Sequence, residues 1–315
     1  AKSNELKRAP LQVGCWSVTI VDRPPWCCIL FAMIPEWREI LKRLSCFAHC
    51  LLIATTLLAT PDFLSAADEA ADKLPLIVAH RGASYDAPEN TLAAFKLAWK
   101  QGADAIEGDF FLSQDGHLVC IHDKDTKRFT GKSMIVKDTP LAVLQQLDVG
   151  SWKDKRFASE RIPTIAEVFA TIPTDKKIFI ELKEGAHIVA PLKQAIEKSG
   201  LKTDQMVIIS FQADAIAESK RQLPQIRAHW LRSYKKDKKT GKYNNDFENI
   251  ARTLKETKAD GLGTKGLPEV VTAPFLKRLQ KAGMQEFSVW TINDAPTANY
   301  FWSLGVVAIT TDRPG

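Results

Sequence analysis

Short apolar segments alternate with helical segments along residues 68–315, and this alternation constrains the fold more than any other feature. Apolar runs of strand length lie at 76–80, 104–110, 177–183, 206–210, 226–231, 259–264, 287–292 and 306–311. Helical periodicity fills 91–101, 164–172, 189–199, 214–223, 247–257, 270–282 and 295–304. Such alternation is typical of a parallel sheet with right-handed crossovers. The 248 residues of this region also match the roughly 250 of one (β/α)8 barrel.

A further strand-like segment, HLVCIH at 117–122, interrupts the alternation. It follows the second strand after only four residues, SQDG. A parallel crossover needs a dozen or more residues, so 104–113 and 117–122 are predicted to form an antiparallel hairpin. In a regular register His122 then returns near the level of Gly108 and Asp109. The predicted fold class is therefore α/β, a (β/α)8 TIM barrel with a β-hairpin insertion at its C-terminal mouth after strand 2.

Charged and polar residues stand at the predicted C-terminal ends of these strands. They are His80, Arg81, Glu107, Asp109, His122, Glu181, Lys183 and Trp290. In barrel enzymes the active site is built at this rim. Glu107 and Asp109 are two apart, so both point to one face of a strand, where like charges need something positive between them. Trp290 is interpreted as a wall of the pocket, and Asn90 is expected to cap the helix that begins at Thr91.

A set of segments carries a resemblance to a known family. The segments are HRGASYDAPENTLAAF (80–95), E-x-D (107–109), HD (122–123), ELK (181–183), VWTIN (289–293) and ITTDRP (309–314). In this order they resemble the glycerophosphodiester phosphodiesterase family over about residues 75–315. The resemblance implies a TIM barrel that hydrolyses glycerophosphodiesters to glycerol 3-phosphate and an alcohol. It also implies one divalent cation, Mg2+ or Ca2+.

The same resemblance implies roles for individual residues. The implied metal ligands are Glu107, Asp109 and Glu181. The implied general acid/base pair is His80 and His122, and the implied phosphate-binding cations are Arg81 and Lys183. Which histidine is the acid stays open, as does the choice between water and the substrate's 2-hydroxyl as nucleophile. One position departs from the family, because Gly108 stands where a bulky aliphatic residue is common. A side chain at this position would face away from the site, so we expect the glycine to affect packing.

Two other functions are kept as alternatives. A phospholipase of the lysophospholipase D or sphingomyelinase D type would need an exposed apolar rim, for which Phe110, Phe111 and Phe211 are candidates. A non-catalytic glycerophosphodiester-binding protein would be expected to lack a metal ligand or a histidine, and this sequence lacks neither.

The N-terminal part has the pattern of a targeting segment. Met33 precedes several basic residues, an apolar run at 46–59 and the small residues SAA at 65–67. We therefore predict a signal peptide at 33–67, an uncertain upstream segment at 1–32, and a secreted or periplasmic enzyme domain at 68–315. The alternative is a membrane anchor formed by an uncleaved segment.

Net charge and cysteine content limit which binding partners and which disulfides are expected for residues 68–315. This region has 36 Lys and Arg against 32 Asp and Glu, a net charge of +4 that is too mild to indicate nucleic acid binding. Of the six cysteines in the sequence, only Cys120 lies in this region, so no disulfide can form within residues 68–315. The Lys-rich stretch 234–246 is expected to be a solvated loop. The expected partner is a small glycerophosphodiester, without a stable membrane span.

Overall fold

The computed structural model describes residues 74–315, so the predicted segments 1–32 and 33–67 lie outside the described residues. Within 74–315 one sheet has the strand order β1-β9-β8-β7-β6-β5-β4-β2-β3. Its strands are β1 (Leu76–Ala79), β2 (Ala105–Leu112), β3 (Leu118–Cys120), β4 (Lys177–Leu182), β5 (Met206–Ser210), β6 (Arg227–Arg232), β7 (Gly261–Lys265), β8 (Glu286–Trp290) and β9 (Ala308–Thr311). A parallel pairing of β1 with β2 closes the sheet. The predicted (β/α)8 barrel is confirmed.

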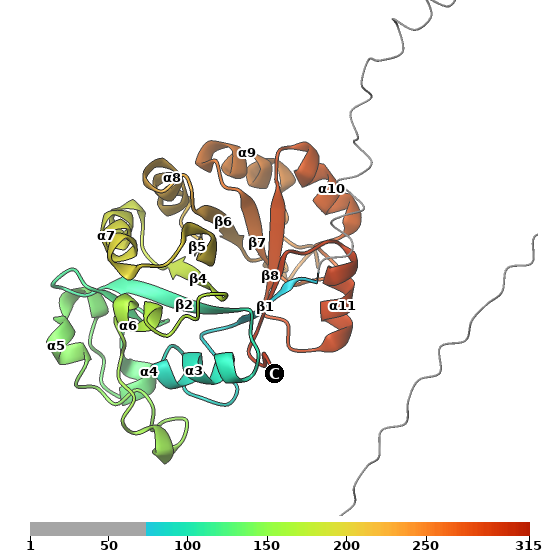
Figure 1. Ribbon diagram of the computed structural model, residues 1–315. Coiled ribbons are helices and arrows are strands. Elements are labelled where there is room, and N and C mark those ends of the chain that lie inside the picture. Colours follow the sequence, from blue (N-terminus) through green and yellow to red (C-terminus); the bar gives the residue numbers. More distant parts are fainter. Residues whose placement is uncertain (1–73) are drawn as a thin grey trace, which may run out of the picture. The chain divides into compact units, whose positions relative to one another are not determined.

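Helices surround the barrel on its outer side, and two further short ones, α4 (Lys127–Thr130) and α5 (Leu141–Leu144), belong to the segment that follows the hairpin (Figure 1). The surrounding helices are α3 (Leu92–Lys100), α6 (Ile165–Phe169), α7 (Val189–Ser199), α8 (Ala213–Gln222), α9 (Phe247–Thr257), α10 (Ala273–Lys281) and α11 (Ala295–Ser303). Short 3-10 turns are η2 (Val136–Asp138), η3 (Lys155–Phe157), η4 (Ala186–Ile188) and η5 (Thr203–Gln205). Among the helices of residues 74–315, none combines the length and hydropathy that a membrane crossing requires.

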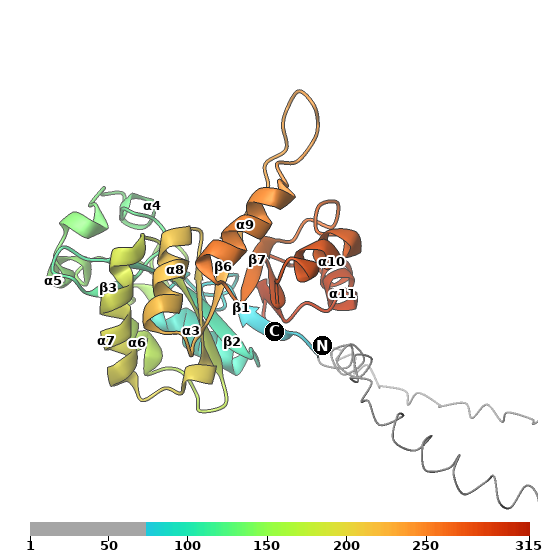
Figure 2. The ribbon, with the colours of Figure 1, turned by 90° about the horizontal axis from the view of Figure 1, so that it is seen from above.

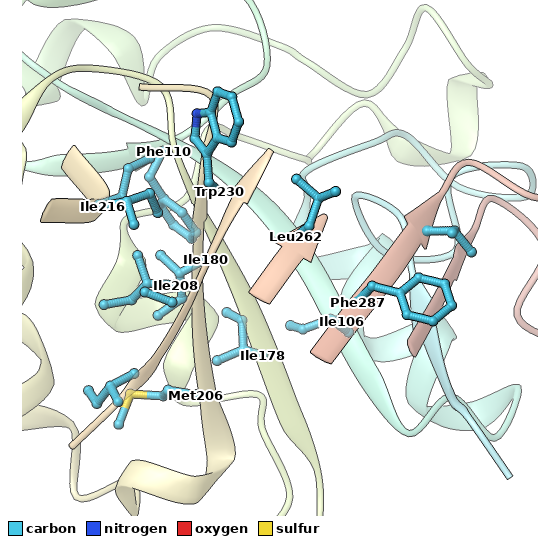
Figure 3. Close-up of a cluster of buried hydrophobic side chains, with 14 of the residues drawn as sticks. Ile106, Phe110, Ile178, Ile180, Met206, Ile208, Ile216, Trp230, Leu262 and Phe287 are labelled. Carbon is cyan, nitrogen blue, oxygen red and sulfur yellow. The ribbon is translucent and has the colours of Figure 1, made fainter. Parts of the chain in front are cut away.

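Along each strand, side chains point alternately to the outside and to the inside of the barrel. On β4, Ile178 and Ile180 are fully buried in the layer between the strands and the helices, where Figure 3 shows them beside Ile106 and Phe110. Burial of each such side chain is worth roughly 1.5–3 kcal/mol. Because the period of a strand is two, Glu107 and Asp109 of β2 and Glu181 of β4 point to the opposite side, into the barrel.

The hairpin predicted after the second strand is present. β3 pairs antiparallel with β2, with Phe110 opposite Cys120 and Leu112 opposite Leu118. Gly116 in the turn has a φ of 80°, a conformation that a residue with a Cβ adopts only with strain. A shift of one residue would turn every side chain to the other face, so this register decides where His122 lies.

The segment that follows the hairpin, residues 123–163, was not assigned any element from the sequence. It contains α4, η2, α5 and η3, and we call it the insertion. Val136, Leu144 and Ile162 form a small core beneath it together with Val119 and Ile121 of the hairpin side. The insertion is thus tied to the hairpin by apolar packing, and it has no periodic helix long enough to be recognised in a sequence.

The Lys-rich loop between β6 and α9 extends away from the barrel (Figure 2). Most of its residues are exposed, as expected, although an isolated bridge joins Lys236 to Tyr243. Its first residue differs from the expectation, because Tyr234 is buried and its hydroxyl accepts a hydrogen bond from Thr264 at 2.8 Å.

Candidate metal and phosphate site

Three carboxylates converge inside the barrel. Glu107 and Asp109 lie on the inner face of β2, and Glu181 of β4 lies opposite Asp109 in the parallel register. One oxygen of each carboxylate lies within 4.8 Å of the other two. Glu107 and Asp109 are 2% and 1% exposed, so water screens their repulsion poorly. Such a cluster is stable only with positive charge among its members.

One oxygen of Glu107 indicates where a cation could be held. Glu107 Oε2 accepts a hydrogen bond from the backbone N–H of Arg81 at 2.9 Å. Its buried Oε1 has no hydrogen-bond partner among the described residues, which costs free energy unless another group satisfies it. An all-carboxylate set suits hard cations such as Mg2+ and Ca2+. The residues present therefore fit a divalent cation of this class.

Two basic side chains contact the same carboxylates. Lys183 Nζ donates hydrogen bonds to Glu181 Oε1 at 2.7 Å and to Asp109 Oδ1 at 3.1 Å. Arg81 Nε lies 3.3 Å from Asp109 Oδ2. With all three carboxylates ionised, the group carries one more negative than positive charge. A divalent cation would make it net positive, which is the sign that attracts a phosphodiester anion.

Asn90 supports the site and does not cap α3. The helix is capped by Thr91, whose side chain accepts a hydrogen bond from the backbone of Ala94. Asn90 has a φ of 58°, and its Nδ2 donates to Asp109 Oδ2 at 2.8 Å while its Oδ1 accepts from the Asp109 backbone at 3.2 Å. The expectation of an Asn90 cap was wrong, because this two-point contact with β2 holds the residue before the helix begins.

Each histidine proposed for catalysis has its Nδ1 held by a carboxylate. His80 Nδ1 lies 2.7 Å from Asp312 Oδ1, and His122 Nδ1 lies 2.7 Å from Asp123 Oδ1. Burial opposes ionisation of Asp312, but hydrogen bonds from His80 and Asn293 outweigh it and lower the pKa of Asp312 to about 2. An ionised carboxylate can only accept, so each Nδ1 carries a proton. Nε2 of each ring is then the nitrogen left to exchange a proton with a substrate.

The three carboxylates differ in their affinity for protons. Burial, with repulsion from Asp109 and Glu181, raises the pKa of Glu107 well above its ordinary value. Burial and the charge of Asp109 raise the pKa of Glu181 to about 7. Burial also opposes ionisation of Asp109, but the positive charges of Lys183 and Arg81 outweigh burial and hold the pKa of Asp109 below its usual range. Protons and a divalent cation would therefore compete for the same oxygens.

The predicted residues line one small cavity of about 160 Å³. Seven of them reach it: His80, Arg81, Glu107, His122, Glu181, Lys183 and Trp290. Asp109 lies next to it within the carboxylate cluster. A larger cavity of about 470 Å³ occupies the opposite end of the barrel, where the strands begin. We place the site at the smaller cavity, because the convergent charged groups are there. Phe179 borders both cavities.

Aromatic residues form the apolar side of the cavity. The rings of Phe211 and Trp290 meet edge to face with centroids 5.5 Å apart, and Phe211 is 42% exposed. The other two aromatics considered for a lipid-facing rim lie elsewhere. Phe110 is fully buried, and Phe111 packs against the core of the insertion.

Several contacts of the site residues were not foreseen from the sequence. Asp312, which holds His80, follows a predicted strand, and Asp123, which holds His122, is the next residue in the sequence. Neither was assigned a role. Glu89 precedes the expected cap Asn90 and had no role of its own, although Arg81 Nη1 donates to its Oε1 at 2.8 Å. Arg128 of the insertion had no recognisable signal, since it follows no periodic pattern.

Comparison with known proteins agrees with this geometry. Residues 80–315 match the model of the Glycerophosphoryl diester phosphodiesterase family. A glycerophosphodiester phosphodiesterase of Caldanaerobacter subterraneus is 39% identical over 156 residues, which cover 48% of this chain and 64% of that protein. A Bacillus subtilis relative is 33% identical over 242 residues, covering 76% of this chain and 94% of that protein.

Solved structures show the same fold. A phosphodiesterase of Oleispira antarctica, in complex with the product sn-glycerol-3-phosphate, superimposes with a TM-score of 0.66 at 29% identity. The alignment covers 78% of this chain and 96% of that chain. A glycerophosphodiester phosphodiesterase of Thermotoga maritima has a TM-score of 0.59 at 27% identity, covering 77% of this chain and 96% of that one.

Proposed function

The chain belongs to the glycerophosphoryl diester phosphodiesterase family, and from that membership we propose a metal-dependent hydrolysis in which two histidines transfer the protons. The enzyme class is glycerophosphodiester phosphodiesterase. The proposed products are glycerol 3-phosphate and an alcohol, which the product-bound relative supports. The observation that carries the mechanism is a carboxylate cluster, with one unsatisfied buried oxygen, in a cavity that two carboxylate-held histidines line.

The residues divide into a metal set and a phosphate set. Glu107, Asp109 and Glu181 would hold the cation. Bound there, Mg2+ or Ca2+ would polarise a phosphoryl oxygen and offset the charge that grows in the transition state. Arg81 and Lys183 would bind the phosphate oxygens, and both are held in place by the carboxylates that they contact.

The two histidines would move one proton each. One Nε2 accepts the proton of the nucleophile, and the other Nε2 donates a proton to the leaving alkoxide. The same arrangement serves an attacking water or the substrate's own 2-hydroxyl, since either must lose a proton. The carboxylates of Asp312 and Asp123 would stabilise the protonated ring, which the base forms when it accepts its proton and from which the acid starts.

A chelator and one histidine substitution test this mechanism. We expect EDTA to abolish turnover of glycerophosphocholine, and added Mg2+ or Ca2+ to restore it. His122→Ala should lower kcat by about 10²–10⁴-fold, the usual contribution of a general acid or base. His117→Ala is the matched control, because His117 lies on the same hairpin with its side chain 55% exposed. Activity that is indifferent to both EDTA and His122→Ala would overturn the mechanism.

A soluble substrate is favoured over a lipid. Of the three aromatics considered for a lipid-facing rim, only Phe211 is exposed at the cavity. We expect faster turnover of glycerophosphocholine than of lysophospholipid at equal concentration. A preference for micellar lysophospholipid would instead support the lysophospholipase D reading.

We also propose that the enzyme is exported. The support is the charge, apolar run and small-residue site at 33–67. N-terminal sequencing of the protein from the periplasm or medium of an expressing cell should begin at Asp68. Recovery of the protein solely from the cytosol, with residues 33–67 retained, would contradict export.

A further inference from the structure

Arg128 does not line the cavity, but it joins two segments that carry site residues. It lies in α4 of the insertion. Its Nη1 and Nη2 donate to the two carboxylate oxygens of Glu89, each at 2.9 Å. Its Nε donates to Asp123 Oδ2 at 2.6 Å. One guanidinium thus makes three charge-assisted hydrogen bonds to two carboxylates, a geometry that a lysine ammonium cannot reproduce.

Each of these carboxylates also holds a residue of the proposed mechanism. Glu89 Oε1 accepts from Arg81 Nη1 at 2.8 Å, and Asp123 Oδ1 lies 2.7 Å from His122 Nδ1. The contacts therefore form a continuous chain from Arg81 through Glu89, Arg128 and Asp123 to His122. Its two ends reach the cavity, and its centre comes from the insertion.

The chain depends on the charge at its centre. Glu89 is 12% exposed at its side chain and Asp123 is 31% exposed, so neither carboxylate is fully screened by water. Arg128 is itself held in place, because its guanidinium lies 4.3 Å from the ring centroid of Phe129, which packs on Trp152. Without Arg128, Glu89 would face Asp123 with no cation between them, and Asp123 would lose one of its two orienting contacts.

We propose that Arg128 is a positioning residue that sets the orientations of Arg81 and His122 together. The inference rests on the proposed function, which assigns Arg81 to the phosphate and His122 to proton transfer. It makes the insertion part of the active site, because a side chain of the insertion controls both ends of the catalytic cavity. Loss of Arg128 should raise KM through Arg81 and lower kcat through His122.

The experiment compares three variants of the full chain at saturating Mg2+. Arg128→Ala should lower kcat/KM for glycerophosphocholine by about 10–100-fold, as expected for groups that orient ligands of a site. Arg128→Lys keeps the charge but loses the fork, so it should recover only part of this loss. Arg156→Ala is the matched control: it removes the same charge from the same insertion, at a side chain 68% exposed. Melting temperatures establish that each variant is folded.

A double-mutant cycle separates positioning from simple charge loss. If Arg128 acts on Arg81 through Glu89, Glu89→Gln and Arg128→Ala should each lower kcat/KM. The fold-loss of the double variant should then be smaller than the product of the two single fold-losses. Losses that multiply, or a loss in Arg128→Ala no larger than in Arg156→Ala, would overturn the inference. Failure of the proposed function is distinct, because then the unmodified enzyme would itself be indifferent to EDTA and to His122→Ala.

Discussion

Gly108 lies between two carboxylates of the candidate metal site, but its own face is turned to the packed layer outside the barrel. A Cβ built there would lie 3.2 Å from Cys120 Sγ and 3.3 Å from Phe95 Cζ. Both distances are shorter than ordinary van der Waals contact. The departure from the family pattern is therefore one of packing: Phe95 and Cys120 fill the volume that an aliphatic side chain at this position would need.

Gly108→Val should lower the free energy of unfolding by about 1–3 kcal/mol, the usual cost of overpacking a core. Cys120→Ala in the same chain should recover part of that loss, because it removes the nearest atom. Urea unfolding of the two single variants and the double variant measures this. Additive losses would show that Cys120 does not limit the space.

Asp312→Asn should lower kcat by about 10–100-fold, because an amide can donate or accept and no longer fixes the proton on His80 Nδ1. Steady-state kinetics with glycerophosphocholine measures the loss. Asp294→Asn is the control, since Asp294 caps α11 on the surface and asparagine caps equally well. Equal activity of both variants would remove Asp312 from the mechanism.

The pKa of about 2 for Asp312 has a consequence for stability. A carboxyl whose pKa is lowered by folding contributes stability above its unfolded pKa of about 3.9 and loses it as the pH falls through the folded value. The stability that Asp312 contributes should therefore be fully present above about pH 3.9 and be lost as the pH falls to about 2.

At the scale of elements, the strands and the longer helices were predictable because their apolar spacing reports which face is buried. The hairpin was predictable because its linker is too short for a crossover. The insertion was not, since α4 and α5 have four residues each and show no period. The cap of α3 was assigned one residue early, because the contact that occupies Asn90 comes from Asp109, far along the chain.

The hairpin turn should couple stability to activity. Gly116 and Gly102 have φ values of 80° and 87°, with open space where a Cβ would lie. Alanine at either position should cost about 1–2 kcal/mol of unfolding free energy, from backbone strain alone. Gly116→Ala alone should also lower kcat, by about tenfold or more, because a displaced hairpin moves His122. Equal activity of the two variants would separate the turn from catalysis.

At the scale of the whole molecule, the residues of the candidate site could be predicted from short motifs, but the side chains that contact them could not. His80 meets Asp312 because β1 pairs with β9 when the barrel closes, and no local spacing records that meeting. Arg128 reaches Glu89 across a segment without periodic pattern. Motifs thus indicated the residues proposed to meet the substrate, and closure of the barrel decided which side chains hold them.

Stability should depend on pH and on divalent cations together. A carboxyl whose pKa is raised by folding contributes stability below its unfolded pKa and loses it as the pH rises through the raised value. For Glu181 that window extends from about 4.3 to about 7. The metal-free protein should therefore lose stability across this range.

Mg2+ or Ca2+ should raise the melting temperature more at pH 7.5 than at pH 5, because fewer protons then compete for the carboxylates. Thermal unfolding with and without each cation measures the difference. Glu181→Gln should reduce the shift at pH 7.5. A melting temperature that neither cation changes at either pH would contradict a metal site formed by these carboxylates.

Phe179 separates the small cavity from the larger one at the other end of the barrel. Phe179 packs there with Val207, Ile209 and Leu231 in an apolar layer inside the barrel. On the carboxylate side of that layer, weak dielectric screening would keep the attraction between the carboxylates and a cation strong. Truncating Phe179 would remove apolar bulk from that layer, so water could approach the carboxylates more closely and weaken their attraction for a cation.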